Sequence, residues 1–224
     1  MNAVERALRE AVVDTCRGMA RLGVAKGTSG NVGVRHGDGF LVSPTGVAYE
    51  RMTPEQVVAM RWDGTFDGDM LPSSEWRFHR DILLQRAEFN AVVHTHSMYA
   101  TALSIMGRGI PAIHYKIAAA GGATIRCAAY ATFGEQALSE LALQAMADRK
   151  ACLLAHHGVI VAETSLERAL GLAVTVEELA QQYLLCLPMG EPPVLDDDEI
   201  ARVMVKYRSY GQQRSSAAPP KETV

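Results

Sequence analysis

The chain has 224 residues, and its 22 basic and 25 acidic side chains give a formal net charge of −3. This length is sufficient for one domain whose core covers both faces of a sheet. Because a slightly acidic chain lacks the basic surface on which nucleic acid binds, we expect no nucleic-acid partner.

The cysteines and the apolar runs bear on the cellular location. Four cysteines are scattered singly, without a CxxC pair, which is typical of reduced thiols in the cytoplasm. Charges at Glu5, Arg6 and Arg9 exclude a signal-peptide core. No apolar run reaches the roughly 18 residues of a membrane span. We therefore expect a soluble cytoplasmic protein without a membrane partner.

The first third of the chain predicts one helix followed by β-hairpins. Apolar residues at helical spacing indicate a helix over 3–22. After a glycine-rich turn, residues 32–35 and 40–42 form an antiparallel hairpin, and residues 57–61 and 65–66 form a second one. Meandering strands favour an antiparallel or mixed sheet over a succession of parallel βαβ units.

The remainder predicts helices that alternate with short apolar strands. A helix begins over 72–75, because serine caps helices well and glutamate suits a first turn. The later elements are a strand bearing His94 and His96, helices over 98–106 and 134–147, strands over 151–155 and 158–162, and helices over 166–187 and 196–210. We expect one domain over 1–211 and a disordered tail over 212–224.

Two histidine pairs follow apolar strands. Side chains alternate along a strand, so His94 and His96 point the same way, about 7 Å apart. The pair His156 and His157 follows another apolar run, 151–155, and spacing does not choose between its members. Any single histidine could be structural, but three imidazoles with an open position are typical ligands of a catalytic divalent metal, usually zinc.

Three segments are rich in glycine amides and small hydroxyls: 27–31, 43–46 and the pair Ser73 and Ser74. Each alone is ordinary turn chemistry, but together they could bind the phosphate of a small substrate. The chain lacks a Walker lysine pattern and GxGxxG, so nucleotide binding is not supported. Glu75, which follows the serines, is either an exposed helix-dipole glutamate or a carboxylate acting as metal ligand or base.

Eight motifs in sequence order, within residues 5–210, resemble the class II aldolase/adducin family. They are GTSGN (27–31), SPTG (43–46), LPSSEWRFH (71–79), VVHTH (92–96), IPAIHY (110–115), AAAGG (118–122), YATFG (130–134) and HHG (156–158). The resemblance implies one three-layer α/β domain, with a mainly antiparallel sheet flanked by helices. It also implies a homotetramer with active sites at subunit interfaces.

The resemblance further implies the site residues. A zinc ion, or manganese or cobalt in its place, would be held by His94, His96, His157 and an exchangeable Glu75, which would also be the catalytic base. Tyr115 from a neighbouring subunit would be the acid on the aldehyde side. The expected substrate-binding residues are Gly30, Asn31, Thr45, Gly46, Ser73 and Ser74 for the phosphate, Phe133 for the aldehyde, and Tyr210 near the C-terminus.

The implied activity is reversible cleavage of a ketose 1-phosphate, such as L-fuculose 1-phosphate, into dihydroxyacetone phosphate and a short aldehyde, such as L-lactaldehyde. A 5-deoxy- or 5-methylthio-ribulose 1-phosphate aldolase is an alternative, because only the aldehyde pocket need differ. An L-ribulose-5-phosphate 4-epimerase is another. A different class is a non-catalytic adducin-like interaction module, which need not retain His94, His96, His157 and Glu75.

Overall fold

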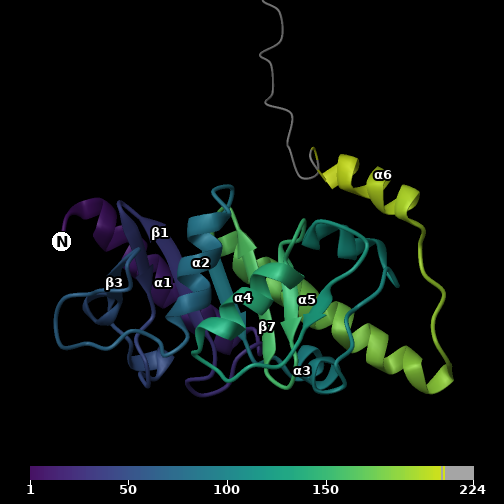
Figure 1. Ribbon diagram of the computed structural model, residues 1–224, viewed down its shortest axis with the longest axis horizontal. Coiled ribbons are helices and arrows are strands. Elements are labelled where there is room, and N and C mark those ends of the chain that lie inside the picture. Colours follow the sequence, from purple (N-terminus) through teal and green to yellow (C-terminus); the bar gives the residue numbers. More distant parts are fainter. Residues whose placement is uncertain (208, 210–224) are drawn as a thin grey trace, which may run out of the picture.

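A seven-stranded sheet forms the centre of the molecule (Figure 1), with strand order β3-β2-β1-β4-β7-β6-β5. The computed structural model describes residues 1–207 and 209. The strands are β1 (Asn31–His36), β2 (Gly39–Val42), β3 (Val58–Arg61), β4 (Ala91–Thr95), β5 (Arg126–Ala128), β6 (Ala151–Leu154) and β7 (Gly158–Glu163). Neighbours run antiparallel except the parallel pair β5 and β6. The expected mainly antiparallel sheet is confirmed.

Helices cover both faces of this sheet and make three layers. They are α1 (Ala3–Arg21), α2 (Trp76–Gln85), α3 (Met98–Ile105), α4 (Gln136–Ala145), α5 (Leu166–Cys186) and α6 (Asp197–Tyr207). Helices α1, α3 and α5 pack on one face, and α2 and α4 pack on the other. Within the described residues, no helix is both long and apolar enough to cross a bilayer.

The alternation of side chains along the central strands divides the interior into two cores. In β7, Val159 and Val161 face the core with α1, α3 and α5, whereas Ile160 and Ala162 face the core with α2 and α4. All four are fully buried. A strand covered on both faces must be continuously apolar, which is why its sequence shows a run and not an alternation. Truncating such a side chain, as in Ile160→Ala, costs about 2–5 kcal/mol of folding free energy.

Most expected elements are confirmed, but three differ. Helix α2 begins at Trp76 and not over 72–75, because Ser73 forms a turn whose carbonyl accepts from the Trp76 amide at 3.1 Å. The second hairpin is reduced to one bridge between Met60 and Phe66, while β3 pairs with β2. Strand β5 was not predicted, since three residues give too short a pattern. The expected end of the last helix at Tyr210 and the tail over 212–224 lie outside the described residues.

Helix α6 lies at the periphery of the molecule, in yellow in Figure 1. It packs against the 3-10 helix η3 (Tyr115–Ala120). The segment before it is attached by a hydrogen bond from the Leu195 amide to the Ala112 carbonyl at 2.9 Å. Strands β4 and β7, by contrast, are buried in the middle of the sheet. The polar residues described next lie at their ends.

Candidate metal centre

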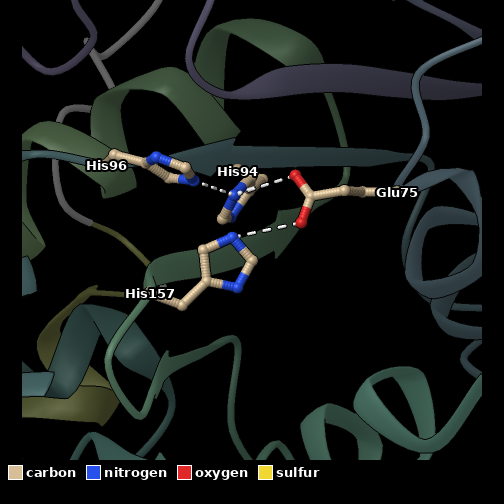
Figure 2. Close-up of side chains that lie close together, drawn as sticks. All are labelled: Glu75, His94, His96 and His157. Atoms are coloured by element: carbon tan, nitrogen blue, oxygen red, sulfur yellow. Dashed lines mark hydrogen bonds and ion pairs between the residues drawn. The ribbon is translucent and has the colours of Figure 1, made fainter. Parts of the chain in front are cut away.

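Four side chains from separate segments meet beside the end of β4 (Figure 2): Glu75, His94, His96 and His157. One nitrogen or oxygen atom from each lies within 4.8 Å of the others. The two histidine pairs therefore meet as the strand patterns predicted. Of the second pair, His157 enters the cluster, whereas the His156 ring lies in edge contact with Tyr130, with 6.0 Å between ring centroids.

Strand β4 places the first pair. His94 lies within β4, opposite Asn31 of β1 and Ile160 of β7, and its ring is fully buried. His96 follows the last residue of the strand, and the alternation of β4 turns it to the same side as His94. The ring centroids of His94 and His96 are 4.8 Å apart. The intervening Thr95 is also fully buried, so the strand end is fixed on both faces.

The tight turn between β6 and β7 places His157. Leu154 and Gly158 are paired across this turn, and the His157 amide donates to the Leu154 carbonyl at 3.0 Å. His156 takes a left-handed conformation with φ of 56°, which lets the chain reverse within so few residues. A Cβ atom on Gly158 would lie 2.4 Å from the Thr95 carbonyl oxygen, so only glycine allows β7 to approach β4 here.

The hydrogen bonds of the cluster leave ring nitrogens free to bind a cation. His94 Nδ1 lies 2.9 Å from the Val159 carbonyl oxygen, which can only accept, so Nδ1 carries the proton. His94 Nε2 then has a lone pair, and it lies 2.9 Å from His96 Nε2 and 3.3 Å from Glu75 Oε2. On the other side, His157 Nε2 lies 3.1 Å from Glu75 Oε1. Carbonyl-held imidazoles of this kind are typical of metal ligands.

The electrostatics of the cluster also fit a cation. Burial opposes the charged form of Glu75, but His94 and His157 together hold its pKa well below the ordinary value. Burial, with His94 and His157 beside it, lowers the pKa of His96 to about 4, so this imidazole is neutral at neutral pH. Glu75 Oε1 is buried, and it faces His157 Nε2 at 3.1 Å in an ion-pair contact outside hydrogen-bond geometry. A buried carboxylate among imidazoles needs a compensating positive charge, and three nitrogens with one oxygen suit zinc.

The three segments rich in hydrogen-bond donors lie side by side next to the cluster. Ser43 pairs with Val32, since its amide donates to the Val32 carbonyl at 2.9 Å and its Oγ accepts from the Val32 amide at 3.0 Å. The Ser73 amide donates to the Ser43 carbonyl at 3.0 Å, and the Thr45 amide donates to the Leu71 carbonyl at 3.1 Å. The sequence could not show that these separate turns form one rim.

Gly30 and Asn31 connect that rim to the cluster. Gly30 packs against the backbone of His94, where an added Cβ would lie 2.5 Å from the carbonyl oxygen. The Asn31 side chain is buried, and its Nδ2 donates to Glu75 Oε2 at 2.9 Å. Its Oδ1 lies 2.6 Å from Nε2 of His79. Asn31 was predicted only as a phosphate ligand, but its amide nitrogen and amide oxygen also form hydrogen bonds with Glu75 and His79.

A cavity of about 330 Å³ opens beside the cluster. Its lining includes Glu75, His96 and His157 from the cluster, together with Ser74, Tyr130, Ala131, Phe133 and His156. Phe133 is 65 % exposed, so its ring is available to a ligand. Arg77 Nη1 donates to the Gly134 carbonyl at 2.7 Å, which fixes the loop that carries Phe133.

Tyr115 does not join the cluster within one chain. It lies on η3, is half exposed and stacks on His114 with 4.6 Å between ring centroids. It lines a separate cavity of about 670 Å³, whose other walls include Thr175 of α5 and Val203 of α6. Tyr210, which was expected near the substrate, lies outside the described residues.

Two residues around the site were not predicted from the sequence. The Glu177 carboxylate of α5 accepts hydrogen bonds from the backbone amides of Tyr99 and Ala100, each at 2.9 Å. These bonds fix the start of α3, just after His96. His79 of α2 lies behind Asn31 and is fully buried. A signal existed for His79, because it follows Glu75 by four residues at the start of a helix and these positions share one face. No sequence pattern points to Glu177.

A mixed sheet between two helical layers, with three histidines and a glutamate meeting beside an open cavity, defines a candidate metal-binding α/β protein. The model of the "Class II Aldolase and Adducin N-terminal domain" family matches residues 10–184. The chain belongs to this family, as its motifs predicted.

The relatives identify the branch of the family. The chain is 52 % identical over 205 residues to an L-fuculose phosphate aldolase of Escherichia coli (strain K12), covering 91 % of this chain and 95 % of that protein. It is 50 % identical over 214 residues to a 5-methylthioribulose-1-phosphate/5-deoxyribulose-1-phosphate aldolase of Rhodospirillum rubrum, with coverage of 96 % and 97 %.

The fold agrees with these similarities. A solved L-fuculose 1-phosphate aldolase superposes with a TM-score of 0.87 at 33 % identity, covering 89 % of this chain and 95 % of that one. Aldolases are thus the family members that this chain resembles in both sequence and structure, and we class it as a class II aldolase.

Proposed function

We propose that the protein is a divalent-metal-dependent lyase that cleaves L-fuculose 1-phosphate, or a similar ketose 1-phosphate, reversibly into dihydroxyacetone phosphate and L-lactaldehyde or a similar short aldehyde. The observation that carries the proposal is the buried Glu75 carboxylate, which faces the ring nitrogens of His94 and His157 at the mouth of a cavity. An E. coli relative with this activity in its name is 52 % identical to the chain.

The residues present fit the metal that this chemistry requires. Zinc, or manganese or cobalt, would be held by His94, His96, His157 and Glu75. When bound there, a divalent cation supplies a Lewis acid that polarises a carbonyl oxygen. The non-catalytic alternative, an adducin-like module, has no need of a buried carboxylate among three imidazoles, so retention of this cluster favours the enzyme.

Glu75 is the acid–base residue of the proposed reaction. When the carbon–carbon bond of the ketose phosphate breaks, its electron pair remains on the carbon next to the carbonyl of the dihydroxyacetone phosphate half. Glu75 then delivers a proton to this carbon, and in the condensation direction it removes that proton. Its two oxygens have different partners, because Oε2 accepts a hydrogen bond from Asn31 while Oε1 faces His157 Nε2 at 3.1 Å.

The rim formed by the donor-rich segments would bind the phosphate. Gly30, Asn31, Thr45, Gly46, Ser73 and Ser74 are the proposed ligands. Support comes from the hydrogen bonds that join Ser43 and Ser73 and from the contact of Gly30 with the His94 backbone. A phosphate held here would position the reacting carbon next to Glu75 without contributing to the chemistry itself.

The aldehyde side of the site would be completed by a second copy of the chain. Phe133 lies in the cavity with Glu75 and would contact the aldehyde. The acid that exchanges a proton with the aldehyde oxygen would be Tyr115 of a neighbouring copy. Tyr210, outside the described residues, is a further proposed substrate-binding residue. Tyr115 is half exposed and lines a cavity other than the one beside the cluster of the same chain. This position supports a site shared between two copies. A homotetramer with closed symmetry would repeat the contact four times.

A second candidate substrate is favoured by one specific observation. The R. rubrum relative, 50 % identical, is a 5-methylthioribulose-1-phosphate/5-deoxyribulose-1-phosphate aldolase. This activity needs the same cluster and rim and differs only in the aldehyde released. An L-ribulose-5-phosphate 4-epimerase would also use the cluster, but would rejoin the carbon–carbon bond. We place the protein in the cytoplasm, which is supported by its four free cysteines.

The test is to incubate the zinc-loaded protein with each candidate sugar phosphate and to measure released dihydroxyacetone phosphate. We expect release from L-fuculose 1-phosphate or 5-methylthioribulose 1-phosphate, with the larger kcat/KM identifying the substrate. Conversion of L-ribulose 5-phosphate into its C4 epimer, without triose release from any sugar, would contradict the lyase.

A further inference from the structure

We propose that His79 is a positioning residue for the proposed reaction: through Asn31 it fixes the orientation of the Glu75 carboxylate. The proposal rests on the proposed function for its catalytic consequence. The chain of contacts itself, from His79 to Asn31 to Glu75, is a feature of the fold.

The hydrogen-bond polarity of this chain follows from what each group can do. A carboxylate only accepts, so the group 2.9 Å from Glu75 Oε2 must be the amide nitrogen of Asn31. The amide oxygen then faces His79, whose Nε2 lies 2.6 Å away. An oxygen that accepts there requires Nε2 to carry the proton. His79 therefore determines which way the Asn31 amide faces, and Asn31 supplies the donor that Glu75 Oε2 accepts.

His79 cannot easily move from this position. Its side chain has no solvent exposure, and its ring packs on Phe78 with 4.8 Å between centroids. On the opposite side, an added Cβ on Gly33 would lie 2.7 Å from His79 Nδ1, so β1 leaves space for the ring only because residue 33 is glycine.

The other ring nitrogen shows that His79 is neutral. Nδ1 is buried and has no hydrogen-bond partner among the described residues, which suits a bare lone pair and not a second N–H. Burial, with His94 nearby, lowers the pKa of His79 to about 3. His79 is thus a fixed neutral donor and cannot supply protons to the reaction.

The chain of contacts joins the sheet to the start of α2, because Asn31 is on the sheet while His79 and Glu75 belong to the helix and its N-cap. Asn31 is the first residue of β1 and pairs with His94 of β4. His79 lies in the first turns of α2, one turn after Glu75. Without the His79 donor, the Asn31 amide could rotate and direct its oxygen at the carboxylate, which would repel it. Glu75 would then lose the contact that distinguishes Oε2 from Oε1.

The test compares His79→Gln with His79→Met, two side chains of similar length of which only glutamine can donate. Zinc affinity is measured by chelator competition, and kcat and KM are measured on the zinc-loaded protein. Loss of an outer hydrogen-bond partner typically costs about 10- to 100-fold in metal affinity or activity. We expect a loss of that size in zinc affinity and kcat for His79→Met, recovery of most of it in His79→Gln, and little change in KM for either variant.

A structural role alone would give a different result. If both variants lowered the melting temperature equally and shared the wild-type zinc affinity and kcat, the positioning role would be wrong.

The tautomer of His79 tests the chain of contacts without any activity. Long-range ¹H–¹⁵N correlation on the metal-free wild-type protein should show His79 protonated at Nε2. Protonation at Nδ1 would overturn the proposal, whatever the enzyme does. Protonation at Nε2 in a protein that neither binds zinc nor releases dihydroxyacetone phosphate would support the chain of contacts and overturn the proposed function instead.

Discussion

The metal-ligating cluster and the region around Tyr115 differ in burial and in the number of contacts that their side chains make within one chain. In the cluster, Glu75 and His94 are buried, and each makes contacts to other segments of the same chain. Around Tyr115 the polar groups are exposed: the ring is 50 % accessible, and the neighbouring Lys116 pairs with Glu178 at 3.1 Å on the surface. Such surface ion pairs contribute about 0–1 kcal/mol.

This difference indicates which part of the chemistry one chain can perform alone. A buried carboxylate is costly unless hydrogen bonds or a cation compensate it, so the fold maintains the cluster only with a defined partner set. Among the described residues, the side chain of Tyr115 has no comparable set of buried partners. Under the proposed function, metal binding would be a property of the single chain, whereas aldehyde protonation would depend on assembly.

The largest expected effect is that of Glu75→Gln. General acid–base catalysis typically contributes about 10²- to 10⁴-fold, so turnover should fall by that factor. The three histidines remain, so much of the zinc binding and the fold should persist. Steady-state turnover and zinc content of the same sample check both points. Glu178→Gln, which removes an exposed carboxylate from the other region, is the matched control; normal turnover in Glu75→Gln would exclude the acid–base role.

The second prediction separates the two adjacent histidines. His157→Ala removes an imidazole from the cluster and should weaken zinc binding by about 100-fold or more. His156→Asn, which keeps a residue that tolerates the left-handed conformation, should leave zinc affinity near the wild-type value. Chelator competition measures both constants. Equal losses in the two variants would mean that the turn, and not the His157 ring, supports the site.

The third prediction concerns the sharing of sites between copies. Tyr115→Phe should slow aldol cleavage by about 10-fold or more while leaving proton exchange on dihydroxyacetone phosphate much less affected. Deuterium loss from labelled dihydroxyacetone phosphate, compared with cleavage, gives the two rates. Equal slowing of both would remove Tyr115 from the aldehyde side.

A mixing experiment tests the sharing itself. If each site takes Glu75 from one copy and Tyr115 from the next, reassembly of Tyr115→Phe chains with Glu75→Gln chains restores about one quarter of the sites. The cleavage rate of the mixture should then exceed the sum of the separate preparations. A rate equal to that sum would show that the two residues act within one chain, or not together.

The smallest expected effect is on stability and concerns His79. Its pKa is about 3 in the folded protein and about 6.5 when unfolded. Only the unfolded chain binds a proton between these values, so the contribution of His79 to stability is fully present above about pH 6.5 and falls by up to about 1.4 kcal/mol per pH unit toward pH 3. Burial is the main cause of this low pKa, and of the titratable groups nearby His94 lowers it further whereas Glu75 raises it.

Urea unfolding of the metal-free protein measures this contribution. In His79→Gln, the free energy of unfolding should depend less on pH than in the wild type between about pH 6 and pH 4. Parallel pH dependences would show that the buried ring is protonated in the folded state as well.

The sheet and the histidine pairs could be predicted because they follow from local periodicity. Apolar runs ending in His94 and His157 gave both the buried strands and the convergence of imidazoles. The start of α2 was predicted too early, because serine is common both at helix N-caps and in turns, and the sequence does not distinguish the two. The turn at Ser73 is stabilised by a contact with Ser43, which lies thirty residues earlier.

The outer contacts of the site could not be predicted, since they join residues far apart in sequence. Glu177 reaches the Tyr99 amide across 78 positions, and His79 reaches Asn31 across 48. Neither contact has a periodic signature, because each depends on how two packed elements cross. The phosphate role expected for Asn31 came from the family resemblance, and its buried partners Glu75 and His79 could not be seen in the sequence.

The central claim is that one chain holds a single divalent cation between its imidazoles and Glu75. Anomalous diffraction at the zinc edge, from crystals grown with stoichiometric zinc, tests it most directly. We predict one peak per chain, about 2.0–2.1 Å from Nε2 of His94, His96 and His157. The absence of a peak at the cluster, or a peak held by other residues, would contradict the account.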